Sequence, residues 1–144
     1  MKRIIYTRPD GGLSVVCPAL NTDEGLAAAQ AKLPVDAINP KVVDFSAIPQ
    51  DRTFRNAWRQ NETLVQHDMV KAREIHRERL RQARMPLFAA NDIAIRDAQL
   101  EGDAAALAAA VTRRNALRDV TADAAIEAAQ TPEELKAAMP DILK

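Results

Sequence analysis

The residues that could carry chemistry in this chain are few, and they include two histidines, His67 and His76. A protein metal site needs three or four ligands at suitable spacing, and neither a His-x-x-x-His nor a Cys-x-x-Cys pattern occurs. His76 falls on the apolar positions of a helical pattern, where a partly buried, hydrogen-bonded histidine is the commoner explanation. We therefore expect no bound metal.

The remaining candidates for catalysis are one cysteine and a few serines. Cys17 has no basic residue nearby in the sequence and precedes Pro18 in a predicted strand, so no partner base is evident. Ser14 and Ser46 lie in no nucleophile-elbow pattern, and no glycine-rich phosphate loop occurs. These patterns predict that the protein is not an enzyme and has no cofactor.

A run of basic residues could bind nucleic acid if its arginines faced phosphates. The run comprises Lys71, Arg73, Arg77, Arg79, Arg81 and Arg84. However, Glu74 can pair with Arg77, and Glu78 with Arg81, across one helical turn. No aromatic residue stands among the arginines to stack on bases, and the net charge of the chain is zero. The pattern favours a solvated or partner-facing helix surface, with nucleic acid unlikely as a ligand.

Phe54, Arg55 and Trp58 form the first candidate binding site. On a short helix the two rings would share one face, and the chain has only five aromatic residues. One interpretation is that both rings anchor an N-terminal head against a long helix, because aromatic residues dominate small cores. The other is a partner-binding surface, since Trp and Arg are enriched among interface hot spots.

A second candidate surface follows Pro86, where apolar residues cover most of the helix circumference. Its members proposed for partner binding are Leu87, Phe88, Ile93 and Ile95. A helix that is apolar nearly all round is buried on more than one side, and a small chain has little mass to cover it. We therefore expect a protein partner, and we expect the protein to form a homo-oligomer.

The first half of the chain reads as a small head that mixes strands and a helix. Residues 2–19 predict a β-hairpin, because β-branched residues flank the turn sequence Pro9–Gly12. Asn21 is a candidate helix cap, with Glu24 three residues later, and that helix should stop near Leu33. Two short strands are expected over residues 42–45 and 63–67.

The second half is helical. Three- and four-residue spacing of apolar residues begins near Asp68, and Pro86 predicts either one bent helix or two short ones. Gly102 should end this helix, and Asp103 should cap the next one, over residues 104–119. So short a connection predicts an antiparallel hairpin. Two shorter helices should open near Thr121 and at Thr131, the latter with Pro132 at its first position and Glu134 completing a capping box.

The predicted fold class is therefore α+β. It comprises a small N-terminal head containing a β-hairpin, residues 1–67, followed by a long kinked helical hairpin and short C-terminal helices, residues 68–144. Large side chains are scarce, which predicts a thin core or one completed by another subunit. One cysteine fits a reducing cytosol, and no secretory signal or 18-residue apolar stretch is found.

Several blocks of the sequence resemble small proteins of tailed bacteriophages and prophages that are encoded near tail genes. The blocks are residues 3–12, 48–58, 68–75, 115–123 and 130–136. The second half also looks like the C-terminal part of tail-fibre assembly proteins. The resemblance implies a chaperone-like phage tail or tail-fibre assembly protein that acts by protein–protein binding in the host bacterial cytoplasm. It implies no catalytic residues.

Two alternatives remain open at this stage. The protein could be a minor structural component that stays in the virion, or a nucleic-acid-binding or host-directed regulatory protein that uses the basic helix. Both would be free of membrane contact, because no segment is long and apolar enough.

Overall fold

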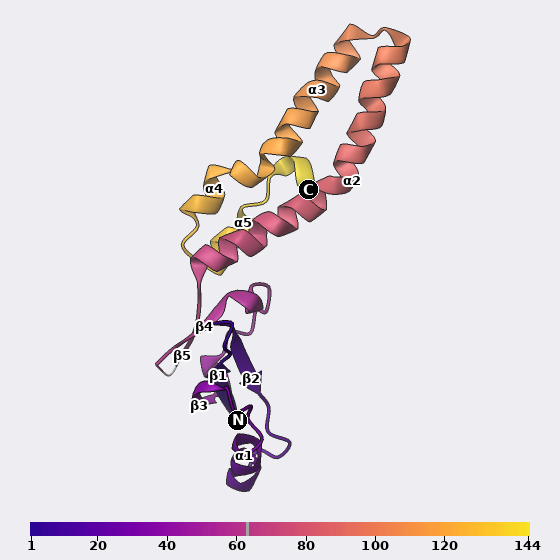
Figure 1. The fold of residues 1–144 in the computed structure, drawn as a ribbon. Coiled ribbons are helices and arrows are strands. Elements are labelled where there is room, and N and C mark those ends of the chain that lie inside the picture. The colour runs from indigo at the N-terminus through magenta and orange to yellow at the C-terminus, as the bar shows by residue number, and fades with distance from the viewer. Residues whose placement is uncertain (63) are drawn as a thin grey trace. The chain divides into compact units, whose positions relative to one another are not determined.

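In the computed structural model, residues 1–62 and 64–144 are described, and the chain divides into two units (Figure 1). The first is Met1–Ala72 and the second is Arg73–Lys144. The long helix α2, Met69–Glu101, begins in the first unit and continues through the second. The predicted α+β class is confirmed: the strands lie in the first unit together with one short helix, and the second unit is helical.

The first unit contains a three-stranded antiparallel sheet with the order β2-β1-β3. The strands are β1, Lys2–Thr7, β2, Leu13–Val16, and β3, Ile38–Asp44. The predicted hairpin is confirmed, with Ile4 opposite Val16 and Thr7 opposite Leu13. Its turn closes through a 2.7 Å hydrogen bond from Arg8 N to Gly12 O, and Gly11 adopts a φ of 77° that glycine tolerates.

Helix α1, Asp23–Gln30, packs on the sheet, but its cap differs from the prediction. Thr22 caps the helix by accepting from Gly25 N at 3.1 Å. Asn21 instead accepts a hydrogen bond from Lys2 N at 3.0 Å, which holds the start of β1 against the segment before α1. Two adjacent residues could both serve as caps, and this tertiary contact decided between them.

The segment around Trp58 also differs from the prediction. The expected short helix over Phe54–Trp58 is only a 3-10 turn, Arg55–Ala57, and Trp58 opens strand β4, Trp58–Asn61. Strand β4 pairs antiparallel with β5, Leu64–His67, and places Trp58 opposite His67. The expected strand over residues 63–67 is thus seen from Leu64, and Thr63 lies outside the described residues.

The core of the first unit lies between the sheet and the β4–β5 hairpin. It consists of Ile5, Leu13, Val43, Ile48, Trp58 and Val65. Trp58 is therefore the large side chain that joins the two sheets. Phe45 was expected in a strand with Val42 and Val43. It lies instead in a 3-10 turn, Phe45–Ala47, and is exposed.

The second unit is built on an antiparallel helical hairpin (Figure 1). Pro86 lies inside α2, so the chain forms one helix here and not two. Gly102, with a φ of 70°, ends α2, and Asp103 caps α3, Ala104–Asp119, by accepting from Ala106 N at 2.9 Å. Both assignments confirm the predicted turn.

Short C-terminal helices complete the second unit: α4, Ala124–Ala128, α5, Pro132–Ala137, and the 3-10 turns Val120–Ala122 and Asp141–Leu143. Thr131 caps α5 as predicted, by accepting from Glu134 N at 3.2 Å. Glu134 reaches back to Gln130 N at 2.7 Å, one residue before the cap, so the reciprocal bond of the predicted capping box is displaced.

Candidate functional site on the helical hairpin

The first candidate surface, Phe54, Arg55 and Trp58, is mostly inside the protein. The side chains of Phe54 and Trp58 are 1% and 2% exposed, and only Arg55 is exposed. In this structure neither ring offers surface to a partner, so the burial of Phe54 and Trp58 favours the interpretation that both rings serve a core. Trp58 serves the core of the first unit.

His67 is engaged by the same tryptophan. The indole Nε1 of Trp58 donates to His67 Nε2 at 3.0 Å, and the two rings meet edge to face with centroids 6.3 Å apart. This bond requires the neutral His67 tautomer that carries its proton on Nδ1. Among the described residues, no group of three or more His, Cys, Asp or Glu side chains is placed to hold a metal ion.

His76 is buried in the second unit. Its Nε2 lies 2.9 Å from the carbonyl oxygen of Ala138, which follows α5. This confirms the interpretation of a buried, hydrogen-bonded histidine. The bond joins α2 to the C-terminal segment.

Two arginines of the basic run also bind main-chain carbonyl groups. Arg73 donates to Ile126 O at 3.2 Å and to Ala129 O at 2.8 Å. Arg84 donates to Leu117 O at 3.2 Å and to Arg118 O at 2.6 Å. These carbonyls lie at the C-terminal ends of α4 and α3, where a helix leaves its last acceptors without helical partners. The two guanidinium groups therefore cap helices.

Two further arginines of the run, Arg77 and Arg81, pair with carboxylates. Arg77 contacts Glu74 at 2.5 Å and also pairs with Glu127 of α4. Arg81 contacts Glu78 at 3.1 Å. The two predicted intrahelical pairs are confirmed. Because these four arginines are engaged within the second unit, the arrangement argues against a continuous phosphate-binding stripe.

Two neighbouring hollows lie along α3 in the second unit and share Ala109 and Arg113 as lining residues. Together they are here called the α3 groove. One end is also lined by Ala90, Asn91, Ala94, Ala106 and Ala110, and the other by Thr112, Ala116, Asp141 and Ile142. Alanine methyl groups form most of the floor, so the α3 groove is shallow and largely apolar.

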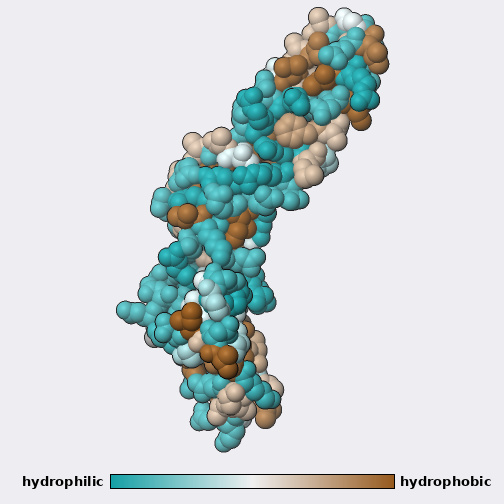
Figure 2. Space-filling view, viewed as in Figure 1, coloured by the Kyte–Doolittle hydropathy of each residue, from teal (hydrophilic) through white to brown (hydrophobic). Residues whose placement is uncertain are grey.

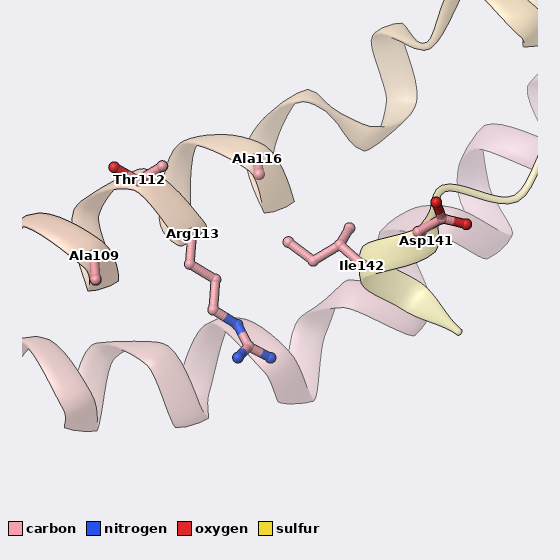
Figure 3. A pocket seen from close by; sticks show the side chains of 6 residues that line it. All are labelled: Ala109, Thr112, Arg113, Ala116, Asp141 and Ile142. Carbon is pink, nitrogen blue, oxygen red and sulfur yellow. The ribbon is translucent and has the colours of Figure 1, made fainter.

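The charged groups of the α3 groove are one cation, Arg113, and one carboxylate, Asp141. Figure 3 shows Arg113 extending from α3 toward α2, and Ile142 extending from the C-terminal turn toward α3. Lys144 donates to Asp141 at 2.5 Å, and this bond lowers the pKa of Asp141, so its carboxylate stays ionised at neutral pH. The groove thus offers charges of both signs beside an apolar floor.

The second candidate surface, Leu87, Phe88, Ile93 and Ile95, is divided by the structure. Leu87, Phe88 and Ile95 are half-buried, and Arg84 lies over the Phe88 ring at 5.4 Å. Ile93 is 54% exposed. Figure 2 shows hydrophobic residues at the surface of the far end of the hairpin. Of the predicted set, Ile93 offers the most surface to a partner.

Sequence reasoning missed the residues that line the α3 groove. Ala106, Ala109 and Ala116 fall in the predicted helix over residues 104–119, and the structure shows all three exposed. The scarcity of large side chains in this part of the sequence could have predicted the groove, because helices that contact each other through alanines leave shallow surfaces between them. Ile142 could not be placed from the sequence, since its position depends on how the C-terminal segment folds back.

Comparison with protein families, with curated proteins and with solved structures finds no match for this chain. Among the described residues, none of the helices has the length and apolar character needed to cross a membrane.

Proposed function

We propose that this protein acts by binding another protein, and that the α3 groove receives a helix or peptide of that partner. The carrying observation is the groove itself, with its floor of exposed alanines and Arg113 and Asp141 at its edges. Amphipathic helices bind by laying an apolar face into such a groove. Small floor residues allow the two backbones to approach closely.

The chemistry of the groove supports binding in preference to catalysis. A hydrolytic or transfer site would bring together a nucleophile, a base and donors for a developing charge. Among its candidates for such roles the groove has the Thr112 hydroxyl, which donates to Ala108 O at 2.9 Å, and the charged side chains of Arg113 and Asp141. A partner helix with an acidic side chain near Arg113 would fit these charges.

The proposed partner class comes from the resemblance to phage proteins encoded near tail genes. On that basis the partner is a phage tail or tail-fibre protein, and the protein assists its assembly in the bacterial cytoplasm without doing chemistry. The hairpin supports this role, because the bonds from Arg73 and Arg84 to main-chain carbonyls hold its helices together while a partner segment binds.

The test is co-expression with phage tail and tail-fibre proteins, followed by affinity purification and titration calorimetry. Ala109→Leu fills the floor shared by both ends of the α3 groove and should weaken binding at least about tenfold, a loss of roughly 1.4 kcal/mol. Ala108→Leu is the matched control, because Ala108 is exposed on the same helix but does not line the groove.

Two outcomes would contradict the proposal. Equal affinity of the Ala109→Leu and Ala108→Leu variants would remove the groove from the interaction. Failure of every tail and fibre protein to bind would remove the tail assembly role. Stoichiometric recovery of the protein from purified particles would replace the assembly role with that of a virion component.

A further inference from the structure

A second apolar surface lies on the outer face of α2, away from the α3 groove. Met85, Ile93 and Leu100 are 63%, 54% and 79% exposed. With Ala89, they recur at helical spacing and share one face, here called the outer stripe. Asn91 and Ala98, which are buried in the hairpin, lie on the opposite face. The outer stripe therefore points away from α3.

Among described residues 85–112, at the end of the hairpin near Gly102, no large apolar side chain is fully buried. The buried residues there are Asn91, Ala98 and Ala110, which are small or polar. The large buried residues of the second unit lie elsewhere: Leu80, Leu117, Ile126 and Leu135. A two-helix layer with exposed Met, Ile and Leu side chains is typical of a surface that another helix covers.

The outer stripe is complementary to itself when two copies of α2 run antiparallel. With the two-fold axis near Ile93, Met85 of each copy faces Leu100 of the other. The small Ala89 then faces the long Arg96, and the two Ile93 side chains meet close to the axis. A two-fold contact of this kind requires one patch that matches its own reversed copy.

The charges beside the outer stripe follow the same symmetry. Asp92 and Arg96 are both exposed and stand one helical turn apart. Around the helix, Asp92 borders the outer stripe, and Arg96 lies within it between Met85 and Ala89. In the antiparallel pair, Arg96 of each copy comes within side-chain reach of Asp92 of the other, so the attraction occurs twice. Asp92 also contacts Arg114 of α3 at 3.2 Å, which holds its carboxylate in place.

We propose that a second copy of this chain covers the outer stripe, forming a two-fold antiparallel pair of α2 helices centred near Ile93. The dimer uses none of the residues that line the α3 groove. It therefore goes beyond the proposed function, and each can fail without the other.

The first test is the mass of the particle, measured by light scattering during size exclusion at about micromolar concentration. Wild-type protein should have the mass of two chains, and Ile93→Asp should give one chain, because it places a charge in the apolar contact. Val111→Asp is the matched control, since Val111 is a half-exposed residue of α3 outside the outer stripe. Circular dichroism must show that both variants keep their helices.

The second test is site-specific cross-linking in a Cys17→Ser background. Ile93→Cys should form a covalent dimer with a short bis-maleimide at least about ten times faster than Val111→Cys. A wild-type monomer, a particle of more than two chains, an Ile93→Asp dimer, or equal cross-linking at both positions would each overturn the proposal. A partial loss of helix in Ile93→Asp leaves the cross-linking comparison to decide.

Discussion

The side-chain amide of Asn91 donates a hydrogen bond of 2.9 Å to the carbonyl oxygen of Ala110, and both residues are buried in the hairpin seam. The other buried residues of this part of the hairpin are the alanines Ala98 and Ala110, which give little shape by which to choose a register. A buried polar group is stable only with its partner in place. Asn91 therefore fixes α3 against α2 at one position.

Replacing Asn91 tests this role. Asn91→Ala should lower the free energy of unfolding by about 1–2 kcal/mol, because a bond and packing volume are lost. Asn91→Leu should be nearly neutral in stability but should loosen the register of the hairpin, as apolar replacements of buried polar residues can do. Urea denaturation gives the first quantity, and amide hydrogen exchange across α3 gives the second. Unchanged protection of α3 in Asn91→Leu would contradict the register role.

The arginines that cap helices should matter more than those on the surface. Arg73→Met removes both bonds to the carbonyls of Ile126 and Ala129, and should lower the free energy of unfolding by about 2–3 kcal/mol. Arg81→Met loses only an exposed pair with Glu78 and should change it by less than about 0.5 kcal/mol. Thermal and urea melts of the two variants provide the comparison. Equal losses would contradict the capping role of Arg73.

The turn and caps of the helical half were predictable because their signals are local. Gly102, Asp103 and Thr131 each act within a few residues of themselves, so the sequence around them contains the whole interaction. The pairs of Glu74 with Arg77 and of Glu78 with Arg81 were predictable for the same reason. The main-chain partners of Arg73 and Arg84 could not be predicted, because the carbonyls that these arginines bind lie tens of residues away in the sequence.

The segment around Trp58 shows the limit of local reasoning. Phe54 and Trp58 stand at helical spacing, but a run this short fits a strand equally well. The strand is stabilised by its pairing with β5 and by burial of the Trp58 indole against Ile5, Val43 and other core residues. The α3 groove was not predicted, and of the outer stripe only Ile93 was expected to bind a partner. Which face of a helix stays uncovered depends on distant segments.

Trp58 is expected to act through packing. Trp58→Ala should lower the free energy of unfolding by about 3–5 kcal/mol, because the side chain is 2% exposed and joins the two sheets of the first unit. Trp58→Phe keeps most of the apolar volume but loses the bond to His67, and should cost about 1–2 kcal/mol. Denaturant titration separates these values. A stable Trp58→Ala protein would contradict the role in the core.

Asp68 should make stability depend on pH in the acid range. Its carboxylate pairs with Arg59 and accepts from Lys71 N at 3.2 Å in the first turn of α2. The bond from Arg59, followed by this backbone bond, lowers the pKa of Asp68 below its ordinary value. A group whose pKa is lower in the folded state binds protons more readily when unfolded. Its contribution is therefore fully present above about pH 4 and is lost as the pH falls through the lowered folded-state pKa.

Two variants test the source of that dependence. Asp68→Asn should reduce the acid-range decline in stability and, at neutral pH, lower the free energy of unfolding by roughly 1 kcal/mol, as loss of a charged helix cap does. Arg59→Met should return the pKa of Asp68 toward its ordinary value, since it removes the largest cause of the shift. Urea midpoints measured from about pH 3 to pH 7 give the profiles of all three proteins. Parallel profiles for wild type and Asp68→Asn would show that other carboxylates govern the acid response.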